Sequence, residues 1–318
     1  MVDAVRRVSC RKHGRLNRHR MTTDSPRASW LAYLLLLFST AAWGLNAVAG
    51  KFAVGHVSPM LLTNLRWAIA GLAALPFAWP HLVRDWPTIR RYPVRLAAYG
   101  VVGFACFNAA MYSALNYTSA INVVIIQAGV PGVIFALNFI VIRQRTTAAQ
   151  LIGFVITVLG VGLIVSGGHI SRLLGLSLNR GDALMLVAIL CYGGFTAALR
   201  TKPAMHWLSF IAVIATAAAI GALPFTYWEY ATGTLVAPDP RGLGVIIFAA
   251  LVPGLTAQAL FIRSNELIGA NRAGVFFNLV PIFGTLFSVL MLGEALRLYH
   301  IVALALVLGG IALAERRR

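Results

Sequence analysis

The chain has 318 residues, of which 59% are hydrophobic and only 11% are charged, and its formal net charge is +18. Soluble globular domains carry about 25% charged residues, so the composition excludes a soluble fold, a disordered protein and a secreted disulfide-bonded domain. The positive charges lie near the start of the chain, in short connections and at its end, a distribution that argues against nucleic-acid binding. We therefore predict a polytopic membrane protein whose surroundings are the lipid bilayer.

Residues 1–29 form a basic leader that we expect to be cytoplasmic and disordered. The apolar run after it contains Ala47-Val48-Ala49, which resembles a signal-peptide cleavage site, but the run is longer than the ~7–15 residues of a signal core. We therefore expect no cleavage. Translation can begin at Met1 or at Met21, and the sequence does not distinguish the two.

Ten apolar stretches of roughly 20 residues follow the leader, each long enough to cross a bilayer as a helix. The predicted fold is therefore all-α, with ten transmembrane helices. Their expected spans are Trp30–Gly50, Leu61–Trp79, Leu96–Ala114, Ala120–Ile142, Ala148–Ser166, Ala183–Leu199, Trp207–Trp228, Leu243–Ile262, Ala273–Gly293 and Leu298–Ala314.

The orientation follows from the distribution of Lys and Arg. If the N-terminus is cytoplasmic, the cytoplasmic segments hold 21 of these residues and the outer segments hold 5. Cytoplasmic segments carry the excess of Lys and Arg, so we expect both termini in the cytoplasm. Arginine outnumbers lysine 24 to 3, which suits a GC-rich bacterial genome and hence the inner membrane.

The chain contains an internal repeat. A shift of 150 residues superimposes Pro131 on Pro281, Gly160 on Gly310, and Asn108 on Gln258. The two copies are residues 30–166 and 182–315, with five helices each, and residues 167–181 link them. Because five is an odd number, the second copy enters the membrane inverted. Inverted repeats are typical of transporters, whose substrate site lies near the bilayer midplane between the copies.

Several residues of the two copies carry a family resemblance. They are Trp43-Gly44-x-Asn46, Lys51 and Ser58-Pro59 leading to Arg66 in the first copy, and Pro281, Gly293-Glu294 and Gly309-Gly310 in the second. This pattern resembles EamA-type transporters, the ten-helix branch of the drug/metabolite transporter superfamily, over residues 30–315. The first copy departs from the pattern, because Arg143-Gln144 stands where the second has Gly293-Glu294.

Pro131 and Pro281 lie about eleven residues into their predicted helices. Proline frees a backbone carbonyl one turn earlier, and in lipid that carbonyl needs a partner in protein or in a watery cavity. The matched prolines indicate a central cavity, and a plain packing kink is the alternative. Polar residues on neighbouring helices complete the set of candidate substrate-cavity residues: Trp43, Asn46, Arg66, Asn108, Tyr112, Gln127, Pro131, Tyr192, Gln258, Asn278 and Pro281. For any one of them, interhelical hydrogen bonding is the alternative role.

Arg66 is the one full charge well inside a predicted span. Charges within the bilayer are costly and are usually paired or functional. Arg66 can reach the outer surface or pair with Glu229 or Asp239; alternatively, it contacts a substrate carboxylate from the cavity mouth.

The leading hypothesis is a secondary transporter that exports amino acids or related small polar metabolites by alternating access. No Asp or Glu lies in the middle of a predicted span, which disfavours polyspecific export of lipophilic cations. The alternative is a translocase of lipid carriers or nucleotide-type metabolites. An enzyme is disfavoured because the sequence holds no convergent set of catalytic groups, and we expect no cofactor and no metal site.

Overall fold

The computed structural model describes residues 26–143, 147–169, 179–268 and 276–315. Most of the leader and residues 170–178 of the linker lie outside the described residues. Every regular element within these ranges is helical: α1 (Pro26–Phe52), α2 (Pro59–Arg91), α3 (Pro93–Gly100), α4 (Phe107–Ala114), α5 (Ala120–Gln127), α6 (Val130–Ile142), α7 (Ala148–Val165), α9 (Arg180–Ala198), α10 (Trp207–Ala231), α11 (Pro240–Ala249), α12 (Ala257–Ile268), α14 (Val280–Leu292) and α15 (Leu298–Glu315).

Seven helical segments of the described chain are long and apolar enough to cross a membrane. Three shorter apolar helices, Ala148–Ile164, Phe277–Leu292 and Leu298–Leu313, occupy three more of the stretches predicted as spans. Large apolar side chains on the helix surfaces are exposed, for instance Leu34 and Leu290. Such a surface suits contact with lipid. That all ten segments cross the bilayer stays a prediction.

The second helix is longer than its predicted span. The span was expected to end at Trp79. Instead α2 continues to Arg91 and contains three interior prolines, Pro76, Pro80 and Pro87. The apolar run ends where the charged residues begin, but a helix can continue beyond the bilayer, so hydropathy gives the end of the span and not the end of the helix.

Two π-helical segments interrupt the bundle at matching places. One, Val101–Cys106, joins α3 to α4, and the other, Ala250–Thr256, joins α11 to α12. They lie about 150 residues apart, the same shift that relates Asn108 to Gln258. π-helical segments are rare and are frequent at functional sites.

The matched prolines begin helices and do not kink continuous ones. A break at Ala128 and Gly129 separates α5 from α6, and a 3₁₀ turn, Phe277–Leu279, precedes α14. Pro131 and Pro281 are therefore each the second residue of a helix. The N–H groups of the first helical residues make no intrahelical hydrogen bonds, so a proline at that position removes none.

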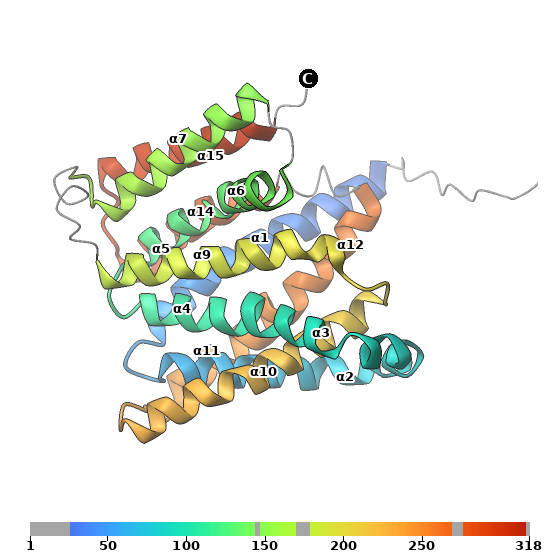
Figure 1. Ribbon diagram of the computed structural model, residues 1–318. Helices are drawn as coiled ribbons and strands as arrows, with labels where there is room; N and C mark the ends of the chain where they lie inside the picture. Colours follow the sequence, from blue (N-terminus) through green and yellow to red (C-terminus); the bar gives the residue numbers. More distant parts are fainter. Residues whose placement is uncertain (1–25, 144–146, 170–178, 269–275, 316–318) are drawn as a thin grey trace, which may run out of the picture.

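Helices distant in sequence pack side by side (Figure 1). α2 packs against α10 and α7 against α15, the two pairs lying at opposite edges of the bundle, while α1 contacts α12 and α14 between them. The described chain starts and finishes on the same side of the molecule, shown on the right of Figure 1. We call that side the Thr201 end, and the opposite side, where α1 ends and α5 begins, the Glu294 end.

Candidate functional site

A central cavity of two adjoining chambers lies between helices of both copies. The larger chamber has a volume of about 510 Å³ and the narrower one about 50 Å³; Trp43, Tyr192 and Gln258 line both. Of the other predicted residues, Pro131 and Asn278 line the larger chamber, and Asn46, Arg66, Asn108 and Gln127 line the narrower one. Nine of the eleven candidates thus line one space.

The two remaining candidates lie outside the lining. Tyr112 is buried behind the narrower chamber, where its hydroxyl donates to Asn46 Oδ1 at 3.0 Å. Pro281 is buried in the first turn of α14, which packs against α1. The cavity prediction thus rests on Pro131 and the polar residues, and the pairing of the prolines does not extend to a shared lining.

Phenylalanines form much of the larger chamber and were not predicted. Phe104, Phe195 and Phe210 line it from three segments, and Trp43 packs between Phe261 and Phe277, with ring centroids 5.2 and 5.5 Å away. The Trp43 indole N–H donates to the carbonyl of Pro253 at 3.1 Å. Phenylalanine is an ordinary residue in membrane helices, so no sequence pattern distinguished these positions.

Arg66 is held inside the protein by neutral partners. It is 3% exposed, and its Nη1 donates to Asn108 Oδ1 at 2.6 Å and to the Tyr112 hydroxyl. The two ion pairs considered from the sequence are not formed. Glu229 accepts instead from the backbone of α2, and Asp239 pairs with His56. The guanidinium thus lies at the wall of the narrower chamber.

Two glutamates hold helix starts at the Glu294 end. Glu294 accepts from the backbone N–H groups of Ala120 and Ile121, at 2.7 and 2.9 Å. Glu229 does the same for Met60 and Leu61, at 3.0 and 3.2 Å. A carboxylate at a helix N-terminus is favoured by the unpaired N–H groups and the helix dipole. Each glutamate thereby fastens the second copy to the start of a helix in the first.

Gly293 allows Glu294 to turn back toward α5. Its φ of +64° is left-handed, a conformation that glycine adopts without steric cost. In the first copy Arg143 takes the corresponding place and has a φ of +52°, the one positive value of a non-glycine residue in the described chain. The backbone turn is therefore kept in both copies although the glycine is not. Gln144, the mate of Glu294, lies outside the described residues.

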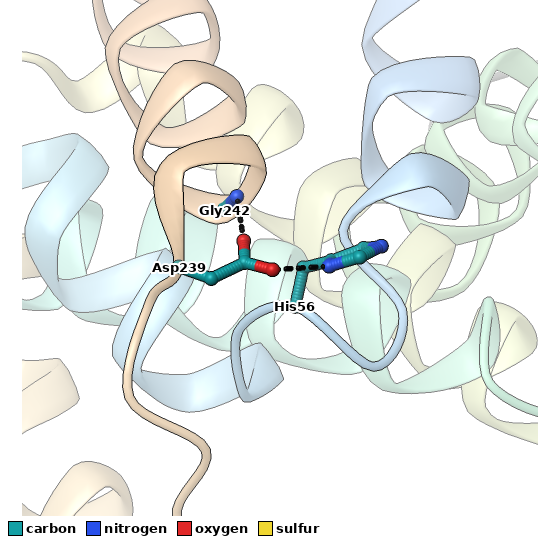
Figure 2. Close-up of polar contacts among 3 residues, drawn as sticks. All are labelled: His56, Asp239 and Gly242. Carbon is teal, nitrogen blue, oxygen red and sulfur yellow. Dashed lines mark hydrogen bonds and ion pairs between the residues drawn. The ribbon is translucent and has the colours of Figure 1, made fainter.

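A third carboxylate contact joins the connection after α1 to the start of α11 (Figure 2). His56 Nδ1 lies 2.6 Å from Asp239 Oδ2, and Asp239 Oδ1 accepts from the N–H of Gly242 at 2.8 Å. The Gly242 N–H and the His56 ring lower the pKa of the Asp239 carboxyl below its ordinary value. Asp182 adds a fourth contact, accepting from the Thr118 hydroxyl at 2.6 Å.

The two ends of the cavity differ in their surroundings. The four carboxylates just described all belong to the second copy and bind groups of the first copy at the Glu294 end. In the opposite direction the larger chamber reaches Leu199, directly after α9, and Ile262 in α12. Polar contacts between the copies thus gather at the Glu294 end, whereas the larger chamber extends toward apolar residues at the Thr201 end.

A separate polar vestibule of about 970 Å³ occupies the Glu294 end. Lys51, Arg180 and Arg297 line it, and Lys51 Nζ donates to the carbonyls of Leu115 and Thr118 at 2.7 and 2.9 Å. Lys51, predicted as part of the family pattern, thus fastens α1 to the connection between α4 and α5. No group of three His, Cys, Asp or Glu in the described part of the chain could hold a metal ion.

Comparisons with known proteins agree with this architecture. The model of the EamA-like transporter family matches residues 30–166 and again residues 179–315. The uncharacterized transporter YyaM of Bacillus subtilis is 23% identical over 89% of this chain and 93% of its own. A probable amino-acid metabolite efflux pump of Salmonella typhimurium is 23% identical over 87% of this chain and 92% of its own.

Two further comparisons extend over most of the chain. The uncharacterized inner membrane transporter YicL of Salmonella typhimurium is 24% identical over 90% of this chain and 96% of its own. One solved crystal structure aligns with 91% of this chain and 97% of its own, with a TM-score of 0.61 and 18% identity. At that identity, the structural match supports the fold alone.

Proposed function

This chain belongs to the EamA-like transporter family, and from that premise we propose that it exports amino acids or related small polar metabolites by alternating access. The cavity between the copies is the substrate site, and the chain is a carrier and not an enzyme. We further propose that it lies in a bacterial inner membrane with both termini in the cytoplasm. The distribution of Lys and Arg and the similarity to the inner membrane transporter YicL support this location.

The observation that carries the proposal is the asymmetry of the cavity. Four carboxylate contacts join the copies at the Glu294 end, where in this proposal they close the cavity, and the larger chamber extends toward the Thr201 end. Alternating access requires a central site that faces one side at a time. With cytoplasmic termini, the described conformation faces the cytoplasm, from which an exporter loads its substrate.

The two-copy arrangement supplies the motion in this proposal. Residues 30–166 and 182–315 are treated as inverted repeats of five helices each. The double match of the family model and the matching π-helical segments support that division. Because the four carboxylate contacts join one copy to the other, their loss would let the copies part at the Glu294 end.

Neutral amides and aromatic rings support a small polar substrate. Asn108, Gln127 and Gln258 offer donors and acceptors without a fixed charge, so they can hold polar groups of either sign. The name of one relative, a probable amino-acid metabolite efflux pump, supports amino acids as the first compounds to test.

The direct test is counterflow in proteoliposomes loaded with a mixed pool of amino acids, with and without a pH gradient. We expect uptake of at least one labelled amino acid, and Gln258→Ala or Asn278→Ala should reduce it by about tenfold or more, the effect of losing one to two substrate hydrogen bonds. Asn116→Ala is the matched control, because Asn116 lines the vestibule and not the cavity. No exchange of any pool member, with a known carrier active in parallel, would reject the amino-acid proposal.

A further inference from the structure

The chemistry of the cavity is graded from one chamber to the other. The larger chamber is lined mostly by phenylalanine and aliphatic side chains, whereas the narrower one gathers Asn46, Asn108, Gln127 and Arg66. Trp43, Tyr192 and Gln258 line both, so the chambers adjoin. A ligand that spans them would place an apolar body in the larger chamber and a polar head in the narrower one.

The charge of Arg66 has no counter-charge in this space. Its hydrogen-bond partners are an amide oxygen and a phenol, its Nε finds no acceptor among the described residues, and no Asp or Glu lines either chamber. A buried charge without an ionic partner is unfavourable, and buried polar groups are normally hydrogen-bonded. The unpaired guanidinium is thus a feature that packing alone does not explain.

Arg66 Nε is buried and has no hydrogen-bond partner among the described residues. Together with Nη2 it forms the edge of the guanidinium that can bind a carboxylate once the narrower chamber admits one. Asn108 and Tyr112 both bind Nη1, which leaves Nε and Nη2 as a pair of parallel donors. Nη2 lies only 3.4 Å from the position that a Cβ on Gly254 would occupy, and Gly254 itself lines the larger chamber. Two parallel N–H donors match the two oxygens of a carboxylate.

From this arrangement we infer that Arg66 binds the carboxylate of the transported compound, and that the substrates are monocarboxylates with an apolar body whose amino group is dispensable. The inference rests on the proposed export function and narrows its substrate class. An ammonium group finds no ionic partner in the described cavity, whereas a carboxylate does. Removing the amino group from a substrate should therefore cost less affinity than removing its carboxylate.

A ligand series on the purified full-length chain tests this without transport. The probes are L-phenylalanine, 3-phenylpropionate, which lacks the amino group, and phenethylamine, which lacks the carboxylate. Their Kd values are obtained from the rise in unfolding temperature with ligand concentration. We expect the two carboxylates to bind within about tenfold of each other and the amine to bind at least about tenfold more weakly, the effect of losing a charge-assisted hydrogen bond.

Substitutions then assign the effect to Arg66. Arg66→Gln should weaken both carboxylates by at least about tenfold, and Arg66→Lys should recover part of the loss, because it keeps the charge but not the paired donors. Arg297→Gln, which removes an arginine from the vestibule, should change nothing. Unchanged carboxylate affinity in a folded Arg66→Gln variant would overturn the inference.

The series also separates this inference from the proposed function. If Arg66→Gln does not fold, the ligand series on the wild-type chain decides. The inference is overturned if phenethylamine binds as tightly as 3-phenylpropionate. It is also overturned if neither L-phenylalanine nor 3-phenylpropionate binds. Transport of an amino acid together with that result would keep the export function and reject Arg66 as the carboxylate site. Selective carboxylate binding without transport would keep Arg66 as the carboxylate site and reject the export function.

Discussion

At the scale of single residues, polar groups in apolar helices were predictable and their partners were not. Asn46, Asn108 and Gln258 are recognisable as cavity residues because amides are costly in lipid unless they face protein or water. The partners of Arg66 were not predictable, since the two carboxylates considered from the sequence, Glu229 and Asp239, bind backbone N–H groups and His56 instead. Helix capping competes with ion pairing, and a sequence does not show which of the two a carboxylate makes.

Glu294 gives the first residue-scale prediction. Glu294→Gln removes the charge that caps α5 and should lower the free energy of unfolding by about 0.5–2 kcal/mol, measured by thermal unfolding in detergent. It should also loosen the Glu294 end. In a chain whose only cysteine replaces Gln127, which lines the narrower chamber, membrane-impermeant thiol reagents should react faster from that end.

Asp85 offers a matched control for Glu294. Its carboxylate accepts from the backbone N–H of His206 at 2.8 Å, but at the Thr201 end. Asp85→Asn should therefore leave labelling from the Glu294 end unchanged. Equal effects of Glu294→Gln and Asp85→Asn would show that Glu294 does not close its end of the cavity.

Asp239 gives a pH prediction. Because the Gly242 N–H and His56 lower the pKa of this carboxyl below its ordinary 3.8, its contribution to stability is present at neutral pH and is lost only as the pH falls through the lowered value. The gap in unfolding temperature between wild type and Asp239→Asn should not shrink as the pH falls from neutral to about 5, and should shrink below about 4. A gap that closes between pH 7 and 5 would contradict the lowered pKa.

At the scale of helices, the sequence predicted where apolar segments lie but not how each is built. The run of apolar residues indicated one continuous helix around Pro131, yet α5 ends at Gln127 and α6 begins at Val130. The π-helical segments were not predictable either. A π-helical turn holds one more residue than an α-helical turn, and this does not change the hydropathy of the segment. The length of α2 was not predictable from hydropathy either, because a helix can continue past the end of its apolar run.

Helix crossing gives the element-scale prediction. A Cβ on Gly310 would lie 2.5 Å from the carbonyl oxygen of Gly153 in α7, whereas one on Gly309 would meet nothing within 4 Å. Gly310→Ala should therefore force α15 away from α7 and destabilise the protein by about 1–3 kcal/mol. Gly309→Ala, the adjacent control, should be neutral or stabilising by up to about 1 kcal/mol. Thermal unfolding of the two variants measures this difference in stability. Equal unfolding temperatures for Gly310→Ala and Gly309→Ala would contradict the close packing of α15 against α7.

At the scale of the whole molecule, the membrane class followed from composition, and the transporter family from the resemblance of motif residues in the two copies. Nine of the eleven candidate residues line the central cavity, among them Asn108 and Gln258, which the repeat shift relates. The aromatic lining and the carboxylate contacts that join the copies at one end were not predictable. Both depend on which helix faces meet across the two copies, and residues far apart in sequence, such as Glu294 and Ala120, show this only in three dimensions.

The central claim is that one cavity opens to each side of the membrane in turn. The most direct measurement uses the single cysteine at position 127 in vesicles of both orientations, labelled with a membrane-impermeant thiol reagent. We predict reaction from the Thr201 end in the absence of substrate, and additional reaction from the Glu294 end when a counterflow substrate is present or when Glu294→Gln is introduced. Labelling from one side only, under every one of these conditions, would contradict alternating access through this cavity.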